Sequence, residues 1–400
     1  MQKNIKSNFH NYIYKKQKGL KNMKVRYFDH AATTPVREEV IKEMIPYLGE
    51  QYGNASAMYS LGRNARKAIN KARGQVATAI NCNPHEIYFT SCGSESDNLA
   101  IKGFAYANHD KGNHIITSKI EHHAVLDTCK ILEKQGFKVT YLNVNENGFV
   151  DLQELVNSIT PNTILISIMF ANNEIGTIEP IEKIGEIAKQ RNIVFHTDAV
   201  QAIGNVSIDV KKLNIDMLSM SGHKFYAPKG VGALYVKKGV KFNKLQDGGE
   251  QENNKRAGTE NVASIVGLGK AIELIYNEYV EYNNKLNNLR NYFFDEVTKN
   301  IPDVKINGDL EKRLPGNANV SFKGKNGSEI LLKLDEAGIC ASAGSACSTA
   351  NPMPSNVLTA IGLKQEFLDG ALRFSFGKAN AGHNVDGRRP RVPNKVKEKN

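Results

Sequence analysis

The chain has 400 residues, 40% hydrophobic and 24% charged, which is typical of globular proteins with more than one domain. Its longest apolar run, residues 164–171, is far shorter than the roughly 20 residues that cross a bilayer, and this argues against a membrane-spanning helix. Residues 1–28 carry +8 and residues 378–400 carry +5 of the net charge of +12. The nearly neutral body therefore gives no indication of a nucleic-acid-binding face.

The two ends of the chain differ from its body. Residues 1–22 are rich in Lys and Asn and contain no acid, and we expect a disordered extension, with a mitochondrial presequence as the alternative. Residues 379–400 are rich in Gly, Pro, Arg and Lys and are also expected to be disordered. Five cysteines without a CxxC pair suit a reducing compartment, so the expected location is the cytoplasm.

From about residue 85 the chain alternates short β-rich runs with helical segments, which indicates an α/β domain. Residues 23–262 are predicted to form this large domain, and its N-terminal segment could pack on the small domain. The expected fold is a mostly parallel sheet with helices on both faces, and its ligand site should lie beyond the carboxyl ends of the strands. The predicted strands are residues 86–91, 113–118, 137–144, 163–170, 192–200, 216–221 and 232–236.

Residues 263–299 carry apolar side chains at alternating spacings of three and four, which predicts a long connecting helix. Residues 300–378 contain strand-like segments such as NANVSF and ALRFSFG and a helical segment near 328–337. This last part is predicted to be a small α+β domain.

The segment FTSCGSESDNLAIKG runs from a strand through Gly93 and Ser94 into a helix, where free backbone N–H groups favour a phosphate. A plain capped helix start is the alternative. In SMSGHKFYAPKG, Ser221, His223 and Lys224 follow another strand, and a buried lysine there could form a Schiff base with a carbonyl cofactor. Spacing alone does not exclude Lys229.

Asp198 ends the strand of HTDAVQ, where a carboxylate could pair with a protonated pyridine nitrogen. A helix cap, or half of a metal site with His196, are the alternatives. His122 and His123 could ligate a metal, stack on a flat cofactor or lie in solvent.

Cys347 lies in ASAGSACSTANPMP, an uncluttered loop of small residues that suits a reachable, reactive thiol. Cys340 lies near the apolar segment EILLKL and is expected to be a buried core residue. Arg373, a single arginine in an apolar strand, should pair with a carboxylate of the protein or of a substrate.

Taken together, these segments resemble the cysteine desulfurases of the NifS/IscS type, pyridoxal-phosphate (PLP) enzymes of the class V aminotransferase group. The resemblance rests on YFDHAATTP, YGNASAMYSLG, FTSCGSESDNLAIKG, EHHAVL, ANNEIG, HTDAVQ, SGHKFYAPKGVGALYV, RAGTEN, GSACS and LRFSFG, which occur in family order. It implies the fold type I of PLP-dependent transferases.

The resemblance also implies roles for individual residues. Lys224 would hold the cofactor covalently and move protons, while His122 stacks on its ring. The other implied cofactor contacts are Gly93, Ser94, Asn173, Asp198, Gln201, Ser221, His223 and Thr259, the last reaching over from the partner subunit of a homodimer. Arg373 and Asn173 would bind the substrate, and Cys347 would accept its sulfur as a persulfide. No resident metal is expected, although Cys347 could transiently ligate an iron–sulfur cluster.

The resemblance implies an enzyme that converts L-cysteine to L-alanine and supplies sulfur to a scaffold or other acceptor protein, for iron–sulfur clusters and possibly for tRNA thiolation. No membrane or direct nucleic-acid partner is expected. The alternatives are an inactive, degenerate or truncated relative, and a selenocysteine lyase or aminotransferase of the same fold. Departures from the family pattern fall at Cys92, Ala227, Glu250, Asn253 and Asn254, and in the segment after Gly377, which is hypothesised to be frameshifted or truncated.

Overall fold

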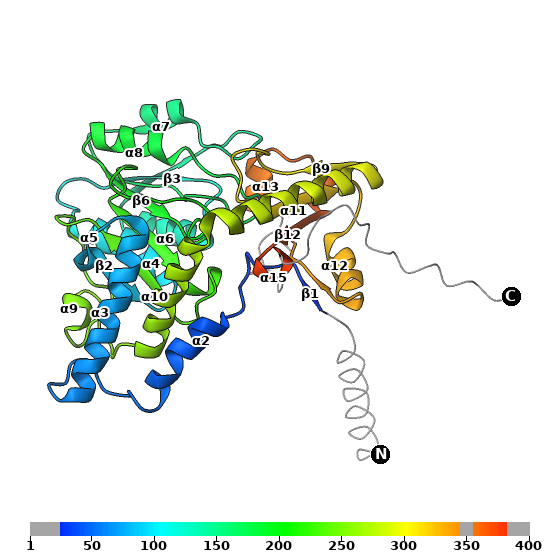
Figure 1. Ribbon diagram of the computed structural model, residues 1–400. Coiled ribbons are helices and arrows are strands. Elements are labelled where there is room, and N and C mark those ends of the chain that lie inside the picture. Colours follow the sequence, from blue (N-terminus) through cyan, green and yellow to red (C-terminus); the bar gives the residue numbers. More distant parts are fainter. Residues whose placement is uncertain (1–24, 344–354, 382–400) are drawn as a thin grey trace, which may run out of the picture.

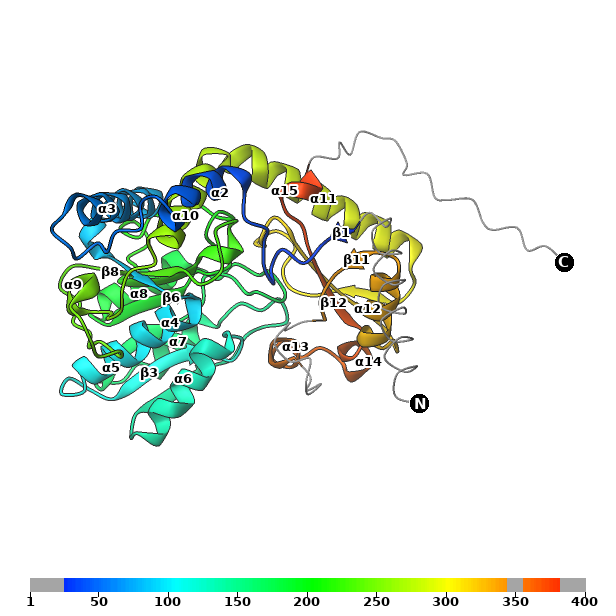
Figure 2. The same ribbon diagram turned by 90° about the horizontal axis from the view of Figure 1, so that it is seen from below.

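The computed structural model describes residues 25–343 and 355–381. A large part built on a seven-stranded sheet and a smaller part built on a three-stranded sheet lie side by side, as two views at right angles show (Figures 1 and 2). Helix α11, Tyr279–Asn300, extends from the large part across the smaller one.

The large sheet has the strand order β2-β8-β7-β6-β5-β3-β4. Every neighbouring pair from β7 to β4 is parallel, whereas β8 is antiparallel to both β7 and β2. This confirms the predicted mostly parallel sheet. The strands are β2 Ile87–Thr90, β3 His114–Ser118, β4 Lys138–Leu142, β5 Thr163–Ser167, β6 Val194–Asp198, β7 Met217–Ser221 and β8 Gly232–Val236.

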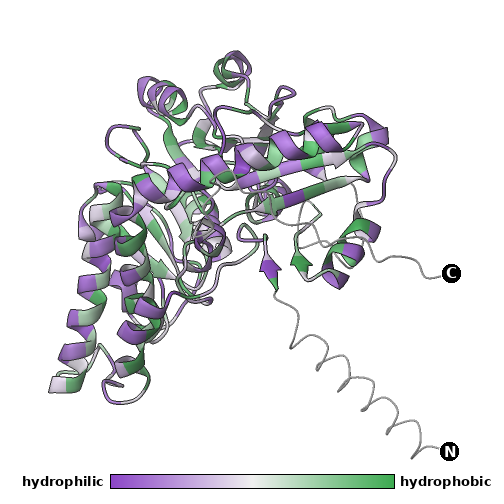
Figure 3. Ribbon diagram, turned by 45° about the vertical axis from the view of Figure 1, so that its right-hand side comes forward, coloured by the Kyte–Doolittle hydropathy of each residue, from purple (hydrophilic) through white to green (hydrophobic). Residues whose placement is uncertain are grey.

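The strands are buried because each face of the sheet has its own hydrophobic cluster. Successive strand residues point to opposite faces, so Ile116 and Ile166 join one cluster while Ile115 and Leu165 join the other. In Figure 3 the strands of the large sheet are mostly green, and the long helices alternate purple and green as amphipathic helices do.

Helices α3, α7, α8 and α10 contribute to the first cluster, and η3, α5 and α6 to the second. α3 and α10 approach closely because a Cβ at Gly269 would lie 2.7 Å from the Cα of Ala72, a contact that only glycine avoids. The helical bounds in this part are α2 Glu38–Met44, η1 Ile45–Leu48, α3 Ser60–Ile80, η2 Pro84–Glu86, α4 Gly93–Asn98, η3 Leu99–Gly103, α5 Phe104–Ala107, α6 His123–Lys134, α7 Leu152–Ser158, α8 Ile181–Gln190, η4 Gly222–Lys224, α9 Gln251–Asn254 and α10 Val262–Asn277.

The smaller part combines the antiparallel sheet β12-β10-β9 with a two-stranded parallel sheet that joins β1 near the start of the described chain to β11. Phe293 of α11 packs against Phe374 and Phe376, with ring centroids 4.9 and 5.7 Å apart. The elements are β1 Arg26–Tyr27, β9 Val304–Ile306, β10 Asn317–Phe322, α12 Gly327–Glu336, β11 Ile339–Cys340, α13 Asn356–Ala360, α14 Gln365–Leu368, β12 Ala371–Ser375 and α15 Lys378–Ala381.

Two details differ from the sequence prediction. The helical pattern over residues 263–299 forms two successive helices, α10 and α11, that meet at Glu278, whose carboxylate is bonded to Arg37. Cys340 is half-buried rather than a core residue, because β11 has only β1 as a partner strand. Within the described residues no helix is long and apolar enough to span a membrane.

Candidate active site

A cavity of about 270 Å³ lies at the carboxyl ends of β5, β6 and β7, against the small part of the molecule. Ten of the twelve site residues expected from the sequence line it, although they come from widely separated segments. They are Gly93, Ser94, His122, Asn173, Asp198, Gln201, Ser221, His223, Lys224 and Arg373. The rule that parallel strands present their ligand site at this edge therefore holds here.

Lys224 ends the short 3₁₀ turn that follows β7, which places its amine in the cavity. Its Nζ donates to the backbone oxygens of Ala31 and Ala32, each at 2.8 Å. The rival Lys229 is exposed and lies outside the lining of the cavity. The structure thus separates two lysines that spacing alone left open.

Ser221 and His223 flank the same turn. Ser221 is the buried last residue of β7, and Nδ1 of His223 lies 3.1 Å from the Thr33 hydroxyl. Burial, reinforced by the positive charge of Lys224, lowers the pKa of His223 to about 4. The ring is therefore neutral near pH 7 and can act as a hydrogen-bond donor without adding a full charge.

Gly93 and Ser94 begin a continuous helical stretch that runs through α4, η3 and α5. A side chain at position 93 would collide with the Val200 side chain, since a Cβ there would lie 2.7 Å from its Cγ2. Because Gly93 and Ser94 line the cavity, the start of the helix lies at its wall, an arrangement that favours an anion.

Asp198 ends β6 at the floor of the cavity. Its Oδ1 accepts from the Val200 backbone N–H at 2.9 Å, and the residue is only 6% exposed. Burial raises the pKa of Asp198, while the nearby His122 and Lys224 partly offset that effect. A buried carboxylate of this kind is stabilised by a cationic partner in the cavity.

Asp97 is a second buried carboxyl that lines the cavity, and the sequence analysis assigned it no role. Burial, and next the charge of Asp198, raise the pKa of Asp97 well above its usual value. Its Oδ1 lies 3.8 Å from His196, but this is no ion pair, since burial lowers the pKa of His196 to about 3. His196 is instead bonded to the hydroxyls of Ser167 and Ser219, at 2.9 and 3.0 Å.

His122 caps the start of α6, which fixes its ring at the cavity wall. Its Nδ1 accepts from the Ala124 backbone N–H at 3.1 Å, so the neutral ring carries its hydrogen on Nε2. Burial is the main reason that the pKa of His122 is lowered. The neighbouring His123 is exposed on the first turn of α6.

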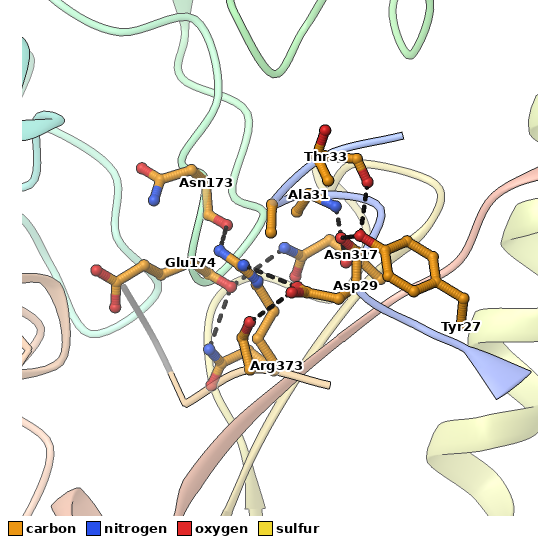
Figure 4. Close-up of polar contacts among 12 residues, drawn as sticks. Tyr27, Asp29, Ala31, Thr33, Asn173, Glu174, Asn317 and Arg373 are labelled. Atoms are coloured by element: carbon orange, nitrogen blue, oxygen red, sulfur yellow. Dashed lines mark hydrogen bonds and ion pairs between the residues drawn. The ribbon is translucent and has the colours of Figure 1, made fainter. Parts of the chain in front are cut away.

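Arg373 of β12 reaches the cavity from the small part (Figure 4). Its Nη1 donates to the backbone oxygen of Asn173 at 2.9 Å, and its Nη2 pairs with Oδ1 of Asp29 at 3.1 Å. The predicted carboxylate partner thus exists within the protein. The sequence analysis quoted YFDHAATTP but gave Asp29 no role. Gln201, which follows β6 and lines the cavity, donates to the Ala31 backbone oxygen at 3.0 Å.

Two expected residues are not brought into this cavity. Thr259 is exposed and lies outside the lining. Cys347 falls outside the described residues. Across residues 25–343 and 355–381, no group of three or more His, Cys, Asp or Glu side chains is arranged to hold a metal ion.

Comparison with known proteins agrees with this geometry. Residues 26–387 match the family described as aminotransferase class-V. The chain is 58% identical over 362 residues to "Cysteine desulfurase IscS" of Clostridium botulinum, which covers 90% of this chain and 91% of that protein. It is 57% identical over 363 residues to the protein of the same name from Methanosarcina thermophila, covering 91% and 90%.

Solved structures give the same result. A "NIFS-LIKE PROTEIN" superposes with a TM-score of 0.84 at 39% identity, covering 88% of this chain and 94% of that one. The structure titled "SspA in complex with cysteine" superposes with a TM-score of 0.78, also at 39% identity, covering 88% and 99%. These likenesses confirm the predicted fold class. The chain belongs to the aminotransferase class-V family, and within it to the cysteine desulfurases of the NifS/IscS type.

Proposed function

We propose that this protein is a PLP-dependent cysteine desulfurase that converts L-cysteine to L-alanine and takes up the released sulfur on Cys347. The observation that carries the proposal is one cavity lined by a lysine amine, a buried carboxylate and an arginine, namely Lys224, Asp198 and Arg373. The relatives named cysteine desulfurase and the neighbour titled as a complex with cysteine support the same substrate.

The residues of the cavity fit the cofactor at its phosphate end. The helix start at Gly93 and Ser94 would receive the phosphate through backbone N–H groups, and a side chain at position 93 would collide with Val200 and Ser221 of the cavity lining. The hydroxyl of Ser221 and the neutral ring of His223 would complete the donor set. This set satisfies an anion with neutral donors, which suits a cavity that is partly closed to solvent.

The residues also fit the ring of the cofactor. Asp198 is a buried carboxylate with a raised pKa, so a protonated pyridine nitrogen would stabilise its ionised form. The His122 ring would stack on the cofactor, and Gln201 and Asn173 would contact its polar groups. When bound, PLP supplies an electron sink for the bonds at the substrate Cα.

The protein's own groups would then act on the substrate. Arg373 would bind the α-carboxylate, with the Asn173 backbone oxygen holding the guanidinium in place. Lys224 would hold the cofactor covalently before the substrate arrives and would afterwards move protons between the substrate carbons. The backbone oxygens of Ala31 and Ala32 keep its amine at the cavity wall.

Sulfur transfer would take place at Cys347. Its thiolate attacks the sulfur of the bound cysteine, so that an S–S bond forms on the protein and the C–S bond of the substrate breaks. The carbon fragment takes up a proton and leaves as alanine. The persulfide would pass its sulfur to a scaffold or another acceptor protein, for iron–sulfur clusters or tRNA thiolation. A homodimer would bring Thr259 to the partner's phosphate site.

A turnover assay tests this proposal. The full chain is loaded with PLP and given L-cysteine with a reducing thiol, and we expect alanine and sulfide in equal amounts. Cys347→Ala should bind cofactor but lose almost all formation of both products. Cys82→Ala is the matched control, because burial raises the pKa of the Cys82 thiol to about 12 and makes it unreactive. Alanine formation at the normal rate by Cys347→Ala would contradict the persulfide mechanism and favour a lyase.

A further inference from the structure

Asp29, in the turn after β1, holds two partners with its two carboxylate oxygens (Figure 4). Oδ1 accepts from Nη2 of Arg373 at 3.1 Å, a contact drawn in the close-up. Oδ2 accepts from the Ser342 hydroxyl at 2.8 Å. The Arg373 side chain is 2% exposed and that of Asp29 is 15% exposed. A guanidinium that is almost fully buried is costly without an anion, and a fixed anion also sets its orientation.

Arg373 nevertheless keeps donors for a second carboxylate. A guanidinium has five N–H donors, and the bonds to Asp29 and Asn173 use two of them. Nε is buried and has no hydrogen-bond partner among the described residues. Because Arg373 also lines the cavity, Asp29 orients its guanidinium while other N–H groups remain for a ligand.

The turn that carries Asp29 is itself fixed on several sides. The Tyr27 hydroxyl lies 3.0 Å from the Asp29 backbone oxygen and 2.8 Å from that of Thr33, and it donates to these carbonyls. The Ala31 backbone N–H donates to the Ser375 hydroxyl at 2.8 Å. The Lys224 amine donates to the Ala31 and Ala32 carbonyls of the same turn. One segment therefore positions both Lys224 and Arg373.

Asp29 also links Arg373 to the segment that follows β11. Arg373 and Ser342 exchange backbone hydrogen bonds, at 2.7 Å from the Arg373 N–H and at 3.1 Å from the Ser342 N–H. The Ser342 side chain then closes the same group by donating to Asp29. The Asp29 carboxylate therefore joins β12 and the segment after β11 to the turn that follows β1.

We propose that Asp29 is a positioning residue that aims Arg373 at the α-carboxylate of the substrate. The inference rests on the proposed function, because it deepens the substrate-binding role of Arg373. Asp29 acts through the guanidinium and does not itself touch the reacting atoms. In Asp29→Asn the amide keeps one oxygen, so it can accept from Arg373 or from Ser342 but not from both, and the negative charge is lost.

The test measures carboxylate recognition without requiring turnover. Calorimetry on the PLP-loaded protein gives dissociation constants for L-alanine and for ethylamine, which is the same amine without the carboxylate. The ratio of the dissociation constant of ethylamine to that of L-alanine reports how well Arg373 holds the carboxylate. We expect Asp29→Asn to reduce this ratio by about tenfold, as expected for a lost charge-assisted hydrogen bond. Ethylamine binding should change little, whereas a general structural defect would weaken both ligands.

Two matched variants separate positioning from simple loosening of the structure. Glu278→Gln breaks the ion pair between Glu278 and the buried Arg37. This ion pair fixes the same N-terminal segment as Asp29 but lies outside the cavity. Ser342→Ala removes only the second bond of Asp29. The first should leave the ratio unchanged. The second should reduce it by less than about threefold, because Asp29 keeps its charge and its bond to Arg373.

The outcomes are distinct. An unchanged ratio in a folded Asp29→Asn protein would overturn the proposal, and so would an equal fall in Glu278→Gln. If Asp29→Asn does not fold, Asp29→Glu gives the same test, because the longer side chain keeps the charge but shifts its position. A ratio reduced at least threefold in Asp29→Glu supports the proposal, and an unchanged ratio overturns it. Failure of the unaltered protein to convert L-cysteine would instead count against the proposed function.

Discussion

The two walls of the cavity differ in the charge of their buried side chains and in whether those side chains have a counter-ion. The wall formed by the large sheet holds two carboxyls, Asp97 and Asp198, whose pKa values burial raises. A third carboxyl, Glu121, is buried outside the lining of the cavity, and burial raises its pKa as well. The wall formed by the N-terminal turn and the small part holds Arg373, which already has Asp29 as its counter-ion.

This difference matches what each wall would bind. On the sheet wall, a cationic ligand such as a protonated pyridine nitrogen would favour the ionised form of a buried carboxyl. A guanidinium that is oriented by one carboxylate is prepared to receive another. Changes on the sheet wall should therefore alter cofactor binding and turnover, whereas changes on the opposite wall should alter affinity for the substrate carboxylate.

The largest expected effect comes from Lys224→Ala, which removes the amine from the sheet wall. Turnover of L-cysteine should fall by about 10³-fold or more, because the protein then lacks both the covalent attachment and the group that moves protons. The visible absorbance of the protein-bound cofactor should also disappear after gel filtration. Both quantities can be measured on the same purified sample.

Lys229→Ala is the matched control for this change. Lys229 lies five residues further along the chain and is exposed outside the cavity, so its loss should leave turnover and cofactor retention unchanged. A large loss of turnover in Lys229→Ala with normal turnover in Lys224→Ala would exchange the roles of the two lysines. That result would also contradict the assignment of the sheet wall as the part of the cavity that binds the cofactor.

The next effect concerns pH and the buried carboxyl of Glu121. Its Oε1 accepts from the Ser118 hydroxyl at 2.6 Å and from the Met169 backbone N–H at 2.9 Å, while burial raises its pKa from 4.5 to about 8. The folded protein then keeps a proton that the unfolded chain releases. The contribution of Glu121 to stability is therefore complete below about pH 4.5 and is lost as the pH rises toward 8.

Glu121→Gln should remove this part of the pH dependence. Urea unfolding at pH 5, 6.5 and 8 should show the free energy of unfolding of the unaltered protein falling more steeply with pH, by roughly 1–3 kcal/mol over the range. Glu186→Gln, an exposed change on α8, is the control and should keep the original slope. Equal slopes in all three proteins would mean that folding does not raise the pKa of Glu121, so that its carboxyl is already ionised at pH 5.

Much of the sheet wall could be predicted from the sequence, because it follows from local patterns. Each buried strand is a short apolar run, and parallel strands end at one edge, so Asp198, Ser221 and Lys224 were expected close together. The break at Glu278 could not be predicted in the same way. The apolar spacing continues through it, and its contact with Arg37 joins residues 241 positions apart.

The opposite wall was harder to predict for the same physical reason. Arg373 could be singled out as a lone arginine in an apolar strand, but its partner Asp29 is 344 positions away and Ser342 is 313 positions from Asp29. Asp97 was missed because a carboxylate in a helical motif is usually in solvent, and only the fold shows that this one is buried. The roles of Thr259 and Cys347 stay predictions.

The smallest expected effect tests a strained loop beside the sheet wall. Glu252, Asn253 and Asn254 have φ values of 47°, 57° and 59°, the left-handed region that favours glycine. Glu252 is held there by Arg73, whose Nη2 lies 2.7 Å from its carboxylate, and by the Phe89 backbone N–H at 2.9 Å. Those bonds hold the loop in this conformation despite its backbone cost.

Asn254→Gly should relieve part of that cost, because Asn254 is exposed and its glycine replacement keeps the conformation without a Cβ. The gain is offset by the greater freedom of glycine in the unfolded chain, so the free energy of unfolding should rise by no more than about 1 kcal/mol. The exposed, helical Asn284, changed to Gly, should instead lower the free energy of unfolding by about 0.3 kcal/mol.

Because the loop is bonded to α4 through Arg256 and Glu95, a gain in stability with lost cofactor binding would mean that the loop conformation serves the phosphate site. Unchanged cofactor binding is the expected result, since Glu252 and Arg256 keep their partners in the variant.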